Sequence, residues 1–206
     1  MRISKVETSI LQAPEDGRPH WVSHFIVPRA NELLVRLETD EGVCGFGLAT
    51  CYSTVEPVVN AINSGITAEV VGCDPLAPER VYEKLFSLTA KRLAHEKGWS
   101  RDALLKISAA VDLACWDIVG KTAGLPLYQL FGGYRDRVPC YVTCAYYRDG
   151  KDEVELRDEI QALKDQGHRG FKAKVGGLSV AEDIERLEIV RDVIGEERDL
   201  MVDANR

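Results

Sequence analysis

Two pairs of polar side chains stand where the sequence alternates as buried strands do. Lys172 and Lys174 lie two residues apart, and Asp203 and Asn205 lie two apart at the end of the apolar segment 199–203. Side chains two residues apart on a strand point to the same side. Two ammonium groups beside a carboxylate that could hold a divalent cation suit the removal of a proton from a carbon acid.

In such chemistry the cation and one ammonium group stabilise an enediolate, while a second lysine, its pKa lowered by neighbouring positive charge, takes the proton. Taken singly, the pairs have simpler explanations, because lysines are ordinary on a solvated edge strand and Asp and Asn favour strand-ending turns. Mg²⁺ prefers several oxygen ligands, so we expect further ligands besides Asp203 downstream, or from substrate and water.

The elements that must position these residues fall into two regions. Strands are predicted over 1–11 and 32–49, with a hairpin turn at 40–42, and helices near 55–70, 78–93 and 101–122. From residue 138 the pattern changes to alternating strands and helices, predicted as strands 138–147, 170–175 and 199–203 and helices 153–166 and 180–194. Capping boxes beginning at Asp152 and Ser179 mark the starts of the last two helices.

The strands of the second region begin about 30 residues apart, which is the size of one βα repeat with a parallel crossover. We therefore predict an α+β domain over 1–125, followed over 126–206 by the first three strands of a modified (β/α)8 TIM barrel. A whole barrel needs about 250 residues. We therefore expect the sequence to be truncated within the barrel.

Composition limits the partners. The chain has 206 residues, with 33 acidic and 26 basic side chains and a formal net charge of −7, so nucleic acid is not an expected partner. We expect no membrane partner either, since no run approaches the roughly 20 apolar residues of a membrane span. The first residues do not form a signal peptide and the six cysteines form no C-x-x-C pair, which favours a cytoplasmic protein with reduced thiols.

The segment 109–133, AAVDLACWDIVGKTAGLPLYQLFGG, resembles the signature of the mandelate racemase and muconate lactonizing enzyme group of the enolase superfamily. The resemblance extends over the whole chain in order and spacing, with Lys-x-Lys on the second barrel strand and Asp-x-Asn on the third. It implies that the first domain caps the barrel. It also implies a Mg²⁺-dependent, homo-oligomeric enzyme that abstracts the proton alpha to the carboxylate of a small substrate.

The same resemblance implies a role for each polar residue of the two pairs. Lys174 would be the acid/base lysine, and Lys172 its partner, which contacts the substrate carboxylate and tunes the basicity. Asp203 would be the first Mg²⁺ ligand. Asn205 would contact the substrate carboxylate or support the ligands.

Two loops of the first domain are candidates for substrate recognition. In the resembled family a loop corresponding to 14–28 closes over the barrel mouth, and a second loop follows the strand that ends near residue 49. Either loop could also be a plain surface connection. The candidate substrate-binding residues in these loops are His20, Trp21, His24 and Tyr52. Trp116 and Asp117, on a predicted amphipathic helix, are expected to be structural.

The resembled family performs several reactions from one half-reaction. We favour acid-sugar dehydration, because polar residues dominate the first capping loop, with a racemase, epimerase or cycloisomerase as alternatives. The groups that discriminate among these reactions belong to barrel strands outside the sequence. A hypothesis of another class is a non-catalytic interaction module, if the chain is complete at 206 residues. For the 206 residues alone we predict no turnover.

Overall fold

The computed structural model describes residues 1–12, 19–27, 31–51 and 55–205. The chain divides into two compact units, of which unit 1 comprises Met1–Ala13 and Ala30–Asp136, and unit 2 comprises Pro14–Arg29 and Arg137–Arg206. A segment from early in the sequence thus belongs with the later unit. The domain boundary expected after residue 125 remains a prediction.

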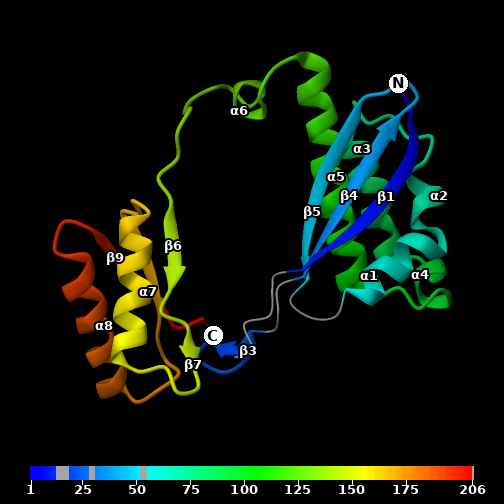
Figure 1. Ribbon diagram of the computed structural model, residues 1–206. Helices are drawn as coiled ribbons and strands as arrows, with labels where there is room; N and C mark the ends of the chain where they lie inside the picture. Colours follow the sequence, from blue (N-terminus) through cyan, green and yellow to red (C-terminus); the bar gives the residue numbers. More distant parts are fainter. Residues whose placement is uncertain (13–18, 28–30, 52–54, 206) are drawn as a thin grey trace. The chain divides into compact units, whose positions relative to one another are not determined.

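Unit 1 contains an antiparallel sheet of three strands, β1 (Ile3–Gln12), β4 (Asn31–Thr39) and β5 (Cys44–Cys51), in the order β1-β4-β5 (Figure 1). The hairpin predicted around 40–42 is confirmed as the turn between β4 and β5. One face of β4 is fully buried, because Leu33, Val35 and Leu37 alternate along it. This face meets the helices of the unit.

Unit 1 has more helices than the sequence predicted, and the two predicted before residue 100 are divided into shorter ones, whereas the third is confirmed as α5 (Arg101–Ala123). The helices are α1 (Glu56–Ala61), η1 (Ile62–Ile66), α2 (Thr67–Val70), α3 (Pro78–Ser87), η2 (Leu88–Ala90), α4 (Arg92–Glu96), α5 and α6 (Leu127–Leu130). The helix expected over 55–70 is interrupted by the π-type turn η1, where Ser64 and Gly65 are weak helix formers. Trp99 fixes this turn by donating a hydrogen bond from Nε1 to Ser64 Oγ at 2.8 Å.

The long helix α5 lies directly against the backbone of β5 (Figure 1). A Cβ atom at Gly47 would lie 1.9 Å from the carbonyl oxygen of Ala110, and one at Gly45 would lie 2.1 Å from that of Ala114. Only glycine permits so close an approach of helix and strand. The two glycines therefore set the depth at which α5, which carries the sequence signature, packs on the sheet.

Unit 2 is built from βα repeats, as predicted. Its parallel sheet has the order β6-β8-β9, made of β6 (Tyr141–Cys144), β8 (Gly170–Lys174) and β9 (Asp199–Asp203). Two helices, α7 (Glu153–Asp165) and α8 (Val180–Ile194), cover one face of this sheet (Figure 1). Both predicted helix starts are confirmed, since the Asp152 side chain caps α7 and Ser179 forms a full capping box with Glu182 in α8.

The first predicted strand of this region is shorter than expected. It ends at Cys144 because Ala145 has a φ of 53°, a left-handed conformation that breaks the ladder. The chain then forms β7 (Tyr147–Arg148), which pairs with β2 (His20–Trp21), and β2 pairs in turn with β3 (Ile26–Val27). This small antiparallel sheet joins the early segment to unit 2.

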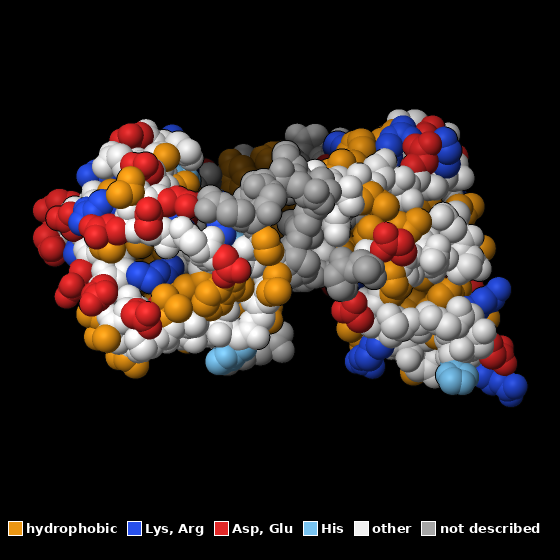
Figure 2. Space-filling model, turned by 60° about the horizontal axis from the view of Figure 1, so that its bottom comes forward, with side chains coloured by type: hydrophobic (Ala, Val, Ile, Leu, Met, Phe, Trp, Pro, Cys, Tyr) orange, Lys and Arg blue, Asp and Glu red, His pale blue; other side chains and the backbone are white. Residues whose placement is uncertain are grey.

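The surface of unit 2 is rich in carboxylates, which Figure 2 shows as red side chains over the region of α7 and α8. Exposed acidic residues of these helices and their caps are Asp152, Glu153, Asp158, Asp165, Glu182, Glu185, Glu188 and Asp192. Among the helices that the structure describes, none is both long and apolar enough to cross a membrane.

Candidate active site

The two lysines lie on the face of the β8 strand that α7 and α8 leave open. Phe171 and Ala173 are buried in the core beneath the helices. The intervening residues, Lys172 and Lys174, therefore point to the opposite side of the sheet, as a period of two requires. This is the face that lines the interior when parallel strands close into a barrel.

Lys174 is a buried cation, with 6% of its surface exposed. Its Nζ atom donates hydrogen bonds to Asp203 Oδ2 at 2.8 Å and to Asn205 Oδ1 at 2.9 Å. A buried charge is tolerated when it is paired and hydrogen-bonded. The structure thus brings together the two sequence pairs through side chains of neighbouring strands.

Asp203 uses its two oxygen atoms for different purposes. Oδ1 accepts a hydrogen bond from the backbone N–H of Asn205 at 2.9 Å, and Asn205 has a φ of 61°, so the residues do form the strand-ending turn typical of their types. Oδ2 faces the lysines and lies 3.3 Å from Lys172 Nζ. Hydrogen bonds from Lys174, from the Asn205 amide and from Lys172 hold the pKa of this carboxyl well below its usual range.

Lys172 has a second partner that the sequence did not indicate. Its Nζ lies 3.4 Å from the hydroxyl oxygen of Tyr141, to which it donates, and 4.9 Å from the centroid of the same ring. Partial burial lowers the pKa of Lys172, but the hydrogen bonds to Tyr141 and Asp203 outweigh it and raise the pKa. Lys172 is therefore a fixed positive charge near neutral pH. Alternation along β6 could have placed Tyr141 on this face.

The arrangement has the chemical character of a site for a small anion. Two ammonium groups converge on Asp203 at the carboxyl end of β9, the end at which barrel enzymes bind substrate, and the hydroxyl of Tyr141 contacts the Lys172 ammonium group. The carboxylate of Asp203 fits a divalent cation, because Mg²⁺ prefers oxygen donors. Among the residues that the structure describes, no three His, Cys, Asp or Glu side chains gather to hold a metal ion. Asp203 is therefore the residue of this cluster that could hold a metal ion.

Two of the candidate recognition residues pack on aromatic rings that follow β6 in unit 2. The His20 ring meets the Tyr146 ring edge-on, with 4.9 Å between centroids, and Trp21 stacks on Tyr147 at 4.5 Å. Tyr146 also lies near Lys174, whose Nζ is 5.7 Å from the centroid of the Tyr146 ring. Sequence reasoning did not single out either tyrosine, because both follow the break in the strand at Ala145.

The structure does not bring His24 to this cluster. His24 lies in the bend before β3 and is exposed. Tyr52 falls outside the described residues, so its expected role stays a prediction.

Asp117 and Trp116 have contacts of a structural kind. Asp117 Oδ2 accepts hydrogen bonds from the Phe46 N–H of the edge strand β5 at 2.9 Å and from Lys121 Nζ at 2.6 Å. Trp116 meets Phe131 edge-on, with ring centroids 4.9 Å apart. Asp117 thus satisfies a strand-edge donor, and both residues secure the packing of α5.

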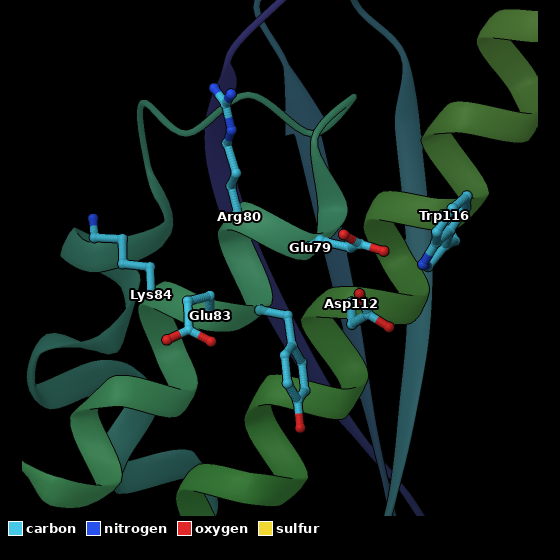
Figure 3. A pocket seen from close by; sticks show the side chains of 7 residues that line it. Glu79, Arg80, Glu83, Lys84, Asp112 and Trp116 are labelled. Carbon is cyan, nitrogen blue, oxygen red and sulfur yellow. The ribbon is translucent and has the colours of Figure 1, made fainter.

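A hollow of about 890 Å³ lies on unit 1, beside α3 and α5 (Figure 3). Its lining residues are Glu79, Arg80, Tyr82, Glu83, Lys84, Asp112 and Trp116. Burial, with a contribution from the charge of Glu79, raises the pKa of Asp112. In Figure 3 the side chains of Arg80 and Lys84 point away from Asp112. Carboxylates line this hollow, but Lys84 is the one lysine among its lining residues. It therefore lacks two lysines that converge on one carboxylate, the feature that makes the unit 2 cluster a candidate for catalysis.

Comparison with known proteins shows which family the chain resembles. Residues 5–132 match the mandelate racemase / muconate lactonizing enzyme N-terminal domain, and residues 155–206 match the enolase C-terminal domain-like family. The chain is 36% identical to an arabinonate dehydratase of Saccharolobus solfataricus over 82% of this chain and 44% of that protein. It is 31% identical to a D-galactarolactone cycloisomerase of Agrobacterium fabrum, over 100% of this chain and 52% of that protein.

A solved structure extends the comparison to the fold. The chain superposes on a racemase from Streptomyces coelicolor A3(2) with bound magnesium, with a TM-score of 0.82 and 28% identity, over 98% of this chain and 55% of that chain. The chain therefore spans about half the length of the relatives that it matches. These matches confirm an α+β capping domain followed by the first part of a modified (β/α)8 barrel. The chain belongs to the mandelate racemase / muconate lactonizing enzyme family of the enolase superfamily.

Proposed function

We propose that the protein containing this chain removes the proton alpha to the carboxylate of an acid sugar and eliminates water, with Lys174 as the base. The observation that carries the proposal is the convergence of Lys174 and Lys172 on one oxygen of Asp203, at 2.8 and 3.3 Å. The family membership and the relative named as an arabinonate dehydratase support the reaction class.

The proposed chemical roles of the residues follow from their surroundings. Lys174 is the general base that accepts the proton from the substrate carbon. Lys172 keeps its charge, because its hydrogen bonds raise the pKa, and it pairs with the substrate carboxylate as negative charge builds up. Asp203 would hold Mg²⁺, which would supply positive charge to stabilise the negative charge that develops on the substrate.

Substrate selection falls to side chains around this centre. Asn205, whose amide oxygen is already 2.9 Å from Lys174 Nζ, orients the base or the substrate carboxylate. His20 and Trp21 are held beside the strand ends by the Tyr146 and Tyr147 rings and contribute polar and flat surfaces to the substrate. Racemisation and cycloisomerisation would use the same half-reaction. They differ in the group that acts on the opposite face of the intermediate.

The proposal is tested with the full-length protein in the presence of Mg²⁺. The protein is incubated in deuterium oxide with pools of sugar acids, hydroxy acids and dipeptides, and the products are analysed by mass spectrometry. We expect one sugar acid to lose water. Deuterium exchange or inversion without water loss would replace dehydration by racemisation, and silence in all pools would contradict carbon-acid chemistry. The isolated 206 residues should be inactive, because one carboxylate holds Mg²⁺ poorly.

A further inference from the structure

A buried carboxylate next to the site has no part in the proposed chemistry. Asp183 of α8 is 7% exposed. Its Oδ1 accepts hydrogen bonds from the Tyr147 hydroxyl at 2.6 Å and from Arg186 at 3.2 Å, and its Oδ2 accepts the Gly176 N–H at 2.7 Å. Burying a carboxylate is costly unless its oxygens are paired, and a surface helix such as α8 can keep an aspartate in solvent instead. The placement of Asp183 therefore serves the segments that it joins.

Arg186 extends the same network to the backbone of the base. Its guanidinium donates to the carbonyl oxygen of Lys174 at 3.3 Å and to that of Ala145 at 2.6 Å. Ala145 is held in its left-handed conformation from both sides, because its N–H also donates to Glu159 Oε1 at 2.9 Å. A non-glycine residue in this conformation is strained, and it persists where the surroundings over-determine it.

Tyr147 connects this network to the capping segment, defined as residues 19–27. The Trp21 ring stacks on Tyr147 with an interplanar angle of 19°, the Arg186 guanidinium lies 4.0 Å from the centroid of the same ring, and Gly177 N–H donates to its hydroxyl at 3.1 Å. A Cβ atom at Gly177 would lie 2.6 Å from the Tyr147 ring and 2.7 Å from that of Trp21. The glycine makes room for both rings.

We propose that Tyr147, Asp183 and Arg186 are positioning residues that couple the seating of the capping segment to the position of Lys174. Trp21 is the residue through which the segment is seated, and the Lys174 carbonyl is the point at which the strand end is held. The inference rests on the proposed function, because it assigns the network to the same site. None of the three residues is a catalytic residue, since each acts through Trp21 or the strand backbone.

The test uses the full-length protein labelled with 5-fluorotryptophan and compares Tyr147→Phe, Tyr147→Ala and Asp183→Asn. Tyr134→Ala is the control, because Tyr134 is 88% exposed and belongs to unit 1. The fluorine NMR signal of Trp21 is assigned by its loss in Trp21→Phe, and its solvent isotope shift reports seating. The kcat and KM of deuterium exchange report the position of the base, and near-UV circular dichroism shows that each variant is folded.

We expect Tyr147→Ala to unseat Trp21 and to raise KM by about 10-fold to 100-fold, the usual effect of losing a supporting contact. Tyr147→Phe keeps the ring and should leave Trp21 seated while lowering kcat, because it loses the hydroxyl bonds to Asp183 and Gly177. Asp183→Asn should lower kcat with a smaller change in KM. An unchanged Trp21 signal in folded Tyr147→Ala, or unchanged kcat and KM in all three variants, would overturn the inference. If the wild type exchanges no deuterium, the proposed function fails, and the NMR signal alone decides whether Tyr147 seats the segment.

Discussion

Lys174 Nζ lies 2.8 Å from Asp203 Oδ2, and the two residues are direct partners in the register of the parallel strands β8 and β9. The pairing follows from the fold, because parallel neighbours in register carry their side chains on the same face. The short distance joins the proposed proton acceptor to the proposed metal ligand at the ends of these strands. The account of the site depends on this pair.

Asp203→Asn should weaken Mg²⁺ binding by the full-length protein and abolish deuterium exchange, because the substitution removes the anionic ligand and leaves two ammonium groups without their carboxylate. Isothermal titration with Mg²⁺ measures the first effect. Asp199→Asn is the control, since Asp199 begins the same strand and is exposed. Equal Mg²⁺ affinities in the two variants would show that Asp203 is not a ligand.

The same carboxylate should contribute to acid sensitivity. Its folded-state pKa is depressed, first by the hydrogen bond from Lys174, so its contribution to stability is present above the unfolded pKa of about 3.9 and is lost as pH falls below it. Between about pH 5 and about pH 3 the wild type should lose more unfolding free energy than Asp203→Asn. Urea denaturation at each pH measures this, and parallel losses would refute the assigned shift.

Sequence reasoning could locate most of the site and part of the fold. The alternation that places Lys172 beside Lys174, and the spacing that puts Asp203 one βα unit later, depend on local periodicity, which a sequence displays. The break at Ala145 was not predictable, because an alanine with positive φ is stabilised by Arg186 and Glu159, which are far away in sequence. The contacts of Tyr146 and Tyr147 follow from that break and were missed with it.

In unit 1, prediction from the sequence had a similar limit. The helix expected over 55–70 has apolar spacing throughout. Its interruption combines the weak helix formers Ser64 and Gly65 with a contact of Trp99, which lies well beyond it in the sequence. The hairpin and the long helix were predicted well, because turn chemistry and a sustained helical period are local signals.

Cysteine reactivity should separate exposed from buried thiols. Burial raises the pKa of the Cys115 and Cys144 thiols to about 12, whereas Cys140 is exposed. An ordinary thiol has a pKa of about 8.5, so the two buried thiols have a thiolate fraction roughly a thousand-fold smaller. Iodoacetamide followed by peptide mass spectrometry should modify Cys140 first, and urea should make all three react. Labelling of Cys144 as fast as Cys140 in the native protein would contradict its burial.

Gly47→Ala should reduce the free energy of unfolding by about 1–3 kcal/mol or more, the usual cost of overpacking, because the new methyl group meets the Ala110 carbonyl of α5. The control is Leu48→Ala on the same strand, where the side chain is 46% exposed and faces away from α5. Chemical denaturation compares the two variants. A Gly47→Ala protein as stable as Leu48→Ala would mean that α5 does not pack on the strand backbone.

The most direct measurement is the rate of deuterium exchange at the carbon alpha to the carboxylate, in the full-length wild type, in Lys174→Ala, and in Lys174→Ala supplied with methylamine. Lys91→Ala, at an exposed position of unit 1, is the matched lysine control. The account predicts that Lys174→Ala lowers exchange by at least about 100-fold, with partial recovery in methylamine and an unchanged fold. Exchange at the wild-type rate in Lys174→Ala would contradict it, because the base would then lie elsewhere.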